Sequence, residues 1–209
     1  MSSLARRERH ALCDLALEVG EDAPTLCGEW TVKQLVAHLL VREYRPWAAA
    51  GIVLSPLAGL TERSMERMAQ RDFAVLVEKL RDPGLTPYRL PPVEVAANTL
   101  EFFVHHEDVR RAQPGWEPRE LSDADLGLLW KLGRGTGKLM ARRLGVPVTI
   151  RRSDTGAEAV LRSGGSPVVV SGPPGELVLF LFGRDYAGDL AFDGPAERVR
   201  RVQDADLGI

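Results

Sequence analysis

The alternation of apolar and polar positions predicts helices through the first two thirds of the chain. Apolar residues recur three or four positions apart, which is the spacing of one helix face. Thr31 and Gln34 form a capping box at the start of the second helix, and Pro46 is expected to kink its end. Five helices are predicted in this way, over residues 3–18, 31–50, 61–80, from about 93, and from Ser122 to about 144.

The stretch from Asn98 to Ala112, NTLEFFVHHEDVRRA, holds the most informative pattern. It contains no Pro or Gly, so it can form one continuous helix. Residues four apart share a helix face, and Glu101 and His105 are therefore neighbours on an apolar face. Asp108 returns to that face one turn later. His106 points about 100° away, toward a neighbouring helix or solvent.

After Gly145 the pattern changes to short apolar runs separated by turns, which is typical of strands. Two strands around the turn SDTG predict a hairpin, and a third strand precedes a helix that Ser171 is expected to cap. We therefore expect a mainly α fold: a four-helix bundle of up to five helices, followed by a small α+β domain. The predicted domains are residues 1–144 and 145–209. The predicted elements of the second domain are strands 146–152, 157–163, 167–171 and 189–192 and helices 175–184 and 195–202.

Composition excludes several classes of function. The net charge is −2 and no basic stripe occurs, so neither nucleic-acid nor membrane-surface binding is expected. No apolar run approaches the roughly 20 residues that cross a bilayer, and residues 1–10 do not resemble a signal peptide. Cys13 and Cys27 form no CxxC pair and fit a reducing compartment, which favours a cytoplasmic protein. We expect a monomer or a homodimer, with Cys27 as a small buried residue.

A carboxylate and an imidazole on an apolar face are costly to bury without a partner. Glu101 and His105 could simply bond to each other, or they could bind a metal. His38 lies in the middle of the second helix among leucines, where it could be a core residue bonded to a carbonyl. In a bundle, however, inward residues at mid-helix can meet. His38, Glu101 and His105 would then form a three-ligand site with an open fourth position, as in catalytic zinc sites, although iron(II) and nickel(II) accept the same ligands.

Three segments resemble, in the same order, recurrent segments of the actinobacterial DinB-like, mycothiol-dependent maleylpyruvate isomerase family: TLCGEWTVKQLVAHL, EFFVHHEDVRRA and GELVLFLFGR. The resemblance implies a DinB-like metal-binding bundle and a second domain similar to sterol-carrier proteins. It implies that His38, Glu101 and His105 bind a divalent metal, with zinc as the first candidate. It also implies that Arg184, which ends the third segment, is a catalytic residue. The HHED sequence at residues 105–108 departs from the family pattern and suggests a separate subgroup.

The chemistry implied is thiol activation, because a coordinating thiol loses its proton. A small thiol, mycothiol in this family, would add to a conjugated cis-diacid and leave after bond rotation, which is an isomerase reaction; without the return step the protein would be an S-transferase. An anionic substrate needs a cation, and Arg184 is the first candidate, with Arg42 or Arg45 as alternatives. Two other hypotheses stay open: a non-catalytic module that binds a metal or small ligand, and a metal-free bundle in which the polar triplet is structural.

Overall fold

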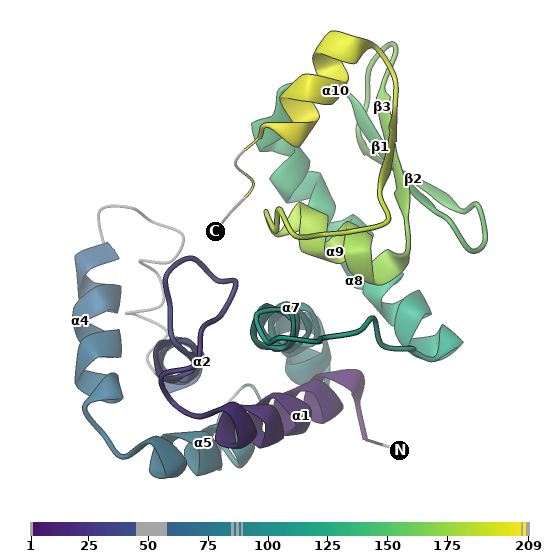
Figure 1. Cartoon of the computed structure of the whole chain (residues 1–209). Coiled ribbons are helices and arrows are strands. Elements are labelled where there is room, and N and C mark those ends of the chain that lie inside the picture. Colours follow the sequence, from purple (N-terminus) through teal and green to yellow (C-terminus); the bar gives the residue numbers. More distant parts are fainter. Residues whose placement is uncertain are drawn as a thin grey trace. The chain divides into compact units, whose positions relative to one another are not determined.

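The chain forms two compact units, Met1–Arg119 and Glu120–Ile209, each with its own apolar core. The first unit is helical, and the second combines helices with a four-stranded sheet (Figure 1). The mainly α class with a small α+β region is therefore confirmed. No helix among the described residues is long and apolar enough to cross a membrane. The computed structural model describes residues 2–44, 58–84, 86, 88, 90–205 and 207.

The helices of the first unit bury one face each in a common core. The predicted capping box is present, since Thr31 N donates to Gln34 Oε1 at 2.8 Å and Gln34 N donates to Thr31 Oγ1 at 3.5 Å. The helix predicted within residues 98–112 is present as α7, which continues a π-helical segment, η3. The bounds are α1 Leu4–Val19, α2 Val32–Tyr44, α4 Ala58–Ala69, α5 Phe73–Arg81, α6 Pro91–Val93, η3 Glu94–Asn98 and α7 Thr99–Arg110.

The single third helix predicted over residues 61–80 is wrong. The chain forms two helices there, because α4 ends at Ala69 and α5 begins at Phe73. Asp72 accepts a hydrogen bond from Val75 N at 3.0 Å, so its side chain caps a new helix instead of continuing the old one. The predicted extension of the second helix to residue 50, with its kink at Pro46, lies outside the described residues.

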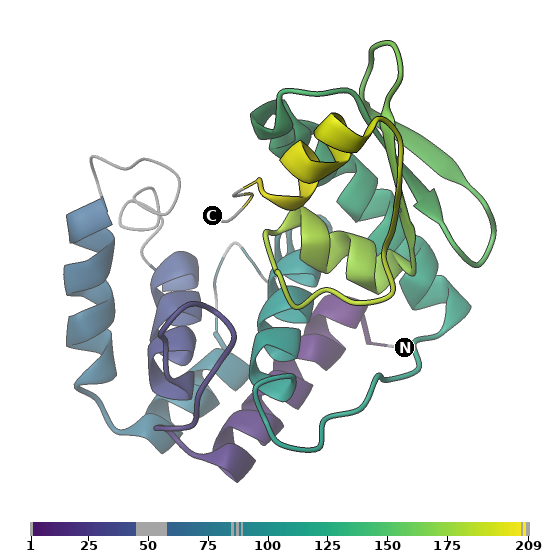
Figure 2. The ribbon, with the colours of Figure 1, turned by 45° about the horizontal axis from the view of Figure 1, so that its top comes forward.

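The second unit packs three helices on one face of its sheet (Figure 2). The strand order is β2-β1-β3-β4; β1 is antiparallel to β2 and parallel to β3, and β4 is antiparallel to β3. Ser171 was expected to cap α9, but it lies in β3 and Pro173 occupies the capping position. The bounds are α8 Asp123–Leu144, β1 Val148–Arg152, β2 Glu158–Arg162, β3 Val168–Gly172, α9 Pro174–Leu181, β4 Ala191–Asp193 and α10 Ala196–Gln203.

Helix α8 belongs to the second unit because glycines let it approach α9 closely. A Cβ added to Gly133 would lie 2.9 Å from Val178 Cγ2, and one added to Gly137 would lie 2.9 Å from Leu181 Cδ1. The sequence-based boundary at residue 144 follows the change from helix to strand. The packing of α8 instead divides the compact units between residues 119 and 120.

Candidate metal centre

Helices α2 and α7 bring His38, Glu101 and His105 together in the first unit. Glu101 Oε1 lies 3.4 Å from His38 Nε2 and 3.5 Å from His105 Nε2, and the two imidazole centroids are 5.2 Å apart. Four-coordinate zinc with bonds of about 2.0–2.2 Å separates its ligand atoms by roughly 3.3–3.6 Å. The spacing of the three side chains therefore fits one divalent ion.

Asp108 fixes the orientation of His105. Its side chain is fully buried, and Oδ2 lies 2.9 Å from His105 Nδ1. An ionised carboxylate accepts a hydrogen bond from the protonated Nδ1, so Nε2 is the nitrogen that faces Glu101. The same carboxylate–histidine pairing supports histidine ligands in metal sites generally. Residues 101, 105 and 108 thus lie on one face of α7, because they are spaced by four and three positions.

Electrostatics make Glu101 anionic and favour a neutral His38. Burial opposes the charge of Glu101, but Arg42 and the two histidines outweigh it and hold the pKa of Glu101 well below its ordinary value. Burial lowers the pKa of His38. Burial would also lower the pKa of His105, yet its hydrogen bonds with Asp108, Cys27 and Glu101 outweigh that effect and raise it well above the ordinary value. A metal ion at Nε2 would replace the proton that faces Glu101, while Nδ1 would keep the proton that faces Asp108.

Arg42 lies directly beside the cluster, one helical turn after His38. Its Nε is 3.3 Å from Glu101 Oε1, and it also donates to Asn98 Oδ1 at 2.8 Å and to the carbonyl of Ala97. A carboxylate has about four acceptor positions, so Glu101 can bind this guanidinium and a metal together. The sequence predicts Arg42 only as an alternative cation for the substrate, and its contact with Glu101 is a finding of the structure. The other alternative, Arg45, lies outside the described residues.

Cys27 is a further neighbour of the candidate site. The sequence predicts a small buried residue, but Cys27 is half-buried, and its sulfur can form a second ligand group with His105 and Asp108, all within 4.8 Å of one another. The backbone amide of Leu26 donates to the carbonyl of Asp108 at 2.9 Å, which holds this loop against α7. The available signal was the position of Cys27 in the same sequence segment as His38.

Trp30 covers the imidazole of His38. Their ring centroids are 4.9 Å apart with a tilt of 42°. Thr25 Oγ1 donates to the carbonyl of Trp30 at 2.8 Å and accepts from Cys27 N at 3.2 Å, so the turn that carries the indole is well defined. Nδ1 of His38 is buried and has no hydrogen-bond partner among the described residues. Nε2 is therefore the nitrogen of His38 that faces polar groups.

His106 and Glu107 point away from the cluster, as the helical geometry of α7 predicts. His106 Nδ1 lies 2.8 Å from Glu8 Oε2 on α1. Arg119 joins both acidic residues, since it donates to the two oxygens of Glu8 at 2.8 Å each and to Glu107 Oε1 at 2.7 Å. His105 and Asp108 of the HHED sequence therefore belong to the candidate metal cluster, whereas His106 and Glu107 contact Glu8 and Arg119.

Arg184 belongs to the second unit. It follows the end of α9, is half-buried, and donates from Nη1 to the carbonyl of Phe182 at 2.9 Å. Its assignment as the cation for the substrate stays a prediction.

The fold is shared with a solved protein described as the mycothiol-dependent maleylpyruvate isomerase. The TM-score is 0.60 with 16% sequence identity, over 91% of this chain and 90% of that chain. Residues 5–86 match the family model of the mycothiol maleylpyruvate isomerase N-terminal domain. Residues 5–86 therefore resemble the N-terminal domain of this family, which supports the resemblance seen in the motif at residues 25–39. The match includes His38 but not Glu101 or His105. No curated protein sequence matches the chain.

Proposed function

We propose that this protein is a metal-dependent enzyme that uses a low-molecular-weight thiol, mycothiol, to transform a small electrophilic substrate. The observation that carries the proposal is the approach of His38 Nε2 and His105 Nε2 to the same oxygen of Glu101, at 3.4 and 3.5 Å. Two neutral imidazole nitrogens and one carboxylate form the ligand set of many catalytic zinc sites, and nickel or iron would also suit it. The family match supports mycothiol as the cosubstrate.

The roles of the chain's residues follow from their contacts. His38, Glu101 and His105 would hold the ion, which would supply a Lewis acid that promotes loss of the thiol proton. Asp108 keeps the proton of His105 on Nδ1. The side chain of Arg42 is 14% exposed and offers positive charge beside the site for an anionic group of the thiol or substrate.

The reaction is either an isomerisation or an S-transfer. In both, the thiolate sulfur forms a bond to an electrophilic carbon of the substrate. If that bond breaks again after rotation, the thiol is regenerated and the product is an isomer. If it persists and the substrate carbon takes up a proton, the product is a thioether. Product analysis with the free thiol separates the two outcomes, since only S-transfer consumes the thiol.

Metal content of the purified protein tests the proposal. We expect about one divalent ion per chain by elemental analysis, and at least tenfold less in His38→Ala. His10→Ala is the matched control, because His10 is exposed on α1. A wild-type protein that binds no divalent metal at micromolar concentrations would refute the proposal. The alternative, a non-catalytic binding module, predicts a bound metal or ligand without turnover of any thiol and electrophile.

Arg184→Ala tests the proposed cation of the second unit. We expect unchanged metal content and fold, with turnover reduced by at least about tenfold, equivalent to ~1.4 kcal/mol of transition-state stabilisation. Arg134→Ala provides the control, because Arg134 is exposed on α8. Loss of the fold would indicate a structural arginine. Unchanged turnover would indicate that another cation, with Arg42 as the next candidate, binds the substrate.

A further inference from the structure

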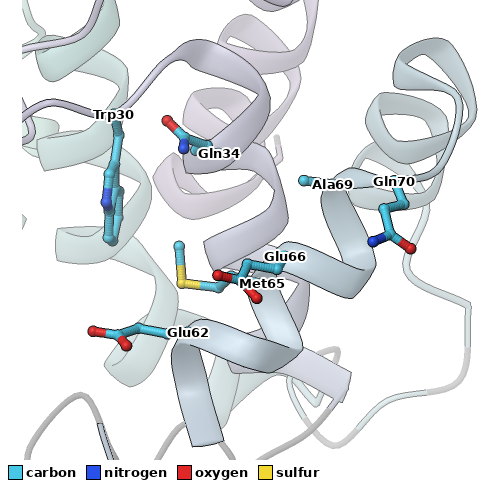
Figure 3. Close-up of a pocket in the computed structure, with 7 residues that line it drawn as sticks. All are labelled: Trp30, Gln34, Glu62, Met65, Glu66, Ala69 and Gln70. Atoms are coloured by element: carbon cyan, nitrogen blue, oxygen red, sulfur yellow. The ribbon is translucent and has the colours of Figure 1, made fainter. Parts of the chain in front are cut away.

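A pocket of about 460 Å³ lies between the start of α2 and one face of α4. Trp30 and Gln34 line it on one side, and Glu62, Met65 and Glu66 line it on the other (Figure 3). Its volume falls within the range of about 300–1,000 Å³ that is usual for small-molecule sites. His38, Glu101 and His105 do not line this pocket, so it is distinct from the candidate metal centre.

The charge of the pocket is negative. Glu62 and Glu66 are four positions apart on α4 and both are exposed, so their carboxylates are neighbours on one helix face. Like charges at this spacing destabilise a helix. Neither carboxylate forms an ion pair with a basic side chain among the described residues, and no Lys or Arg lines the pocket. The remaining polar lining, Gln34 and Gln70, is neutral. This lining disfavours an anion and favours a cation.

Trp30 adds a flat aromatic surface to this negative site. Tryptophan is the best aromatic partner for an ammonium group, through attraction between the cation and the ring face. Contact with His38 and the hydrogen bond from Thr25 hold the indole in place before any ligand arrives. The thioether of Met65 provides a polarisable apolar contact for alkyl groups on the cation. An aromatic face opposite two carboxylates is a common arrangement for alkylammonium recognition.

We propose that this pocket binds a small organic cation that carries an ammonium group, with the charge between Trp30 and the two carboxylates of Glu62 and Glu66. The apolar part of the ligand would contact Met65. None of its lining residues belongs to the metal cluster, but Trp30 contacts His38, so the pocket is a neighbour of the candidate metal centre and shares no residue with it.

Calorimetric titration of the full chain with choline tests the proposal. Saturable binding is expected, with dimethylbutanol, the uncharged isostere of choline, at least about tenfold weaker. The double variant Glu62→Gln/Glu66→Gln should also weaken choline binding at least about tenfold, since it removes both charges and keeps the shape. Glu18→Gln/Glu120→Gln is the matched control, because it removes two exposed carboxylates elsewhere and should bind choline like the wild type.

Several results would overturn the proposal. Absence of saturable choline binding is one, and equal affinity for choline and its isostere is another. Unchanged affinity in Glu62→Gln/Glu66→Gln, with an unchanged circular dichroism melting curve, would exclude the carboxylates. Competition by magnesium chloride at equal concentration would indicate a carboxylate metal site instead. Chelator-treated protein should still bind choline, and loss of binding would indicate that choline binds at the metal centre. A wild-type protein that binds choline but takes up no divalent metal would refute only the proposed enzyme and leave this proposal intact.

Discussion

Replacement of Asp108 by Asn tests how the candidate metal centre is organised. Asp108 is fully buried, and its Oδ2 lies 2.9 Å from His105 Nδ1. Asparagine keeps the volume of the side chain but removes its charge. Its amide can also donate to Nδ1, which would place the proton of His105 on Nε2, the nitrogen that faces Glu101. The substitution should therefore weaken metal binding without altering any ligand.

The expected magnitudes separate loss of metal from loss of fold. Residues that support a ligand histidine typically contribute 10–100-fold in metal affinity, which is ~1.4–2.8 kcal/mol. Exchange of a charge-assisted hydrogen bond for a neutral one costs about 1–2 kcal/mol of unfolding free energy. Domains are commonly stable by about 5–15 kcal/mol, so Asp108→Asn should remain folded at 25 °C.

Competition with a chromophoric chelator measures the affinity, and urea unfolding of the metal-free protein measures stability. Asp22→Asn is the control, because Asp22 is exposed in the loop before α2. If Asp108→Asn binds metal as tightly as the wild type, then Asp108 does not set the tautomer of His105 and the reasoning is refuted.

Three further predictions concern stability. His106→Ala should leave metal content unchanged but lower the unfolding free energy by about 1–3 kcal/mol, because Glu8 loses a buried partner at 2.8 Å; loss of metal alone would contradict the assigned direction of His106. Burial opposes the ionisation of Glu8, but hydrogen bonds from His106 and Arg119 outweigh it and lower the pKa of Glu8. Its contribution is therefore present above the unfolded pKa of about 4.3 and lost as pH falls through the lower folded value, so Glu8→Gln should flatten the acid limb of a stability–pH curve. Gly137→Ala should destabilise the protein by about 1–3 kcal/mol, because the added Cβ would approach Leu181. Gly135→Ala, whose Cβ would lie in open space, should stabilise it by about 0.5–1 kcal/mol. Thermal melts that reverse this order would contradict the packing of α8.

Local rules predicted the helix ends well where a cap is encoded in neighbouring residues. Ser122 begins α8 by accepting from Asp125 N at 3.3 Å, and Gly145 ends it with a left-handed backbone, φ 69°. The break between α4 and α5 was missed because apolar residues continue at helical spacing on both sides of it. Asp72 was the signal, since aspartate is among the strongest N-cap residues.

The part of the candidate site that lies on one helix could be predicted from the sequence. The spacing of Glu101, His105 and Asp108 follows from helical geometry alone. The positions of Cys27 and Arg42 beside them depend on how the loop before α2 folds against α7 and on how the two helices pack. Such contacts join residues far apart in the chain, and no periodicity in the sequence encodes them.

The division of residues 105–108 between two groups of side chains has a consequence for sequence variation among relatives. Positions 106 and 107 contact Glu8 and Arg119, so exchanges there should be accompanied by exchanges at those two positions, whichever reaction a relative catalyses. Asp108 should instead be retained wherever 38, 101 and 105 are retained. Relatives that keep the residues at 8, 106, 107 and 119 but lose those at 38, 101, 105 and 108 would have the same fold without the metal site. Their sequences would identify them without an assay.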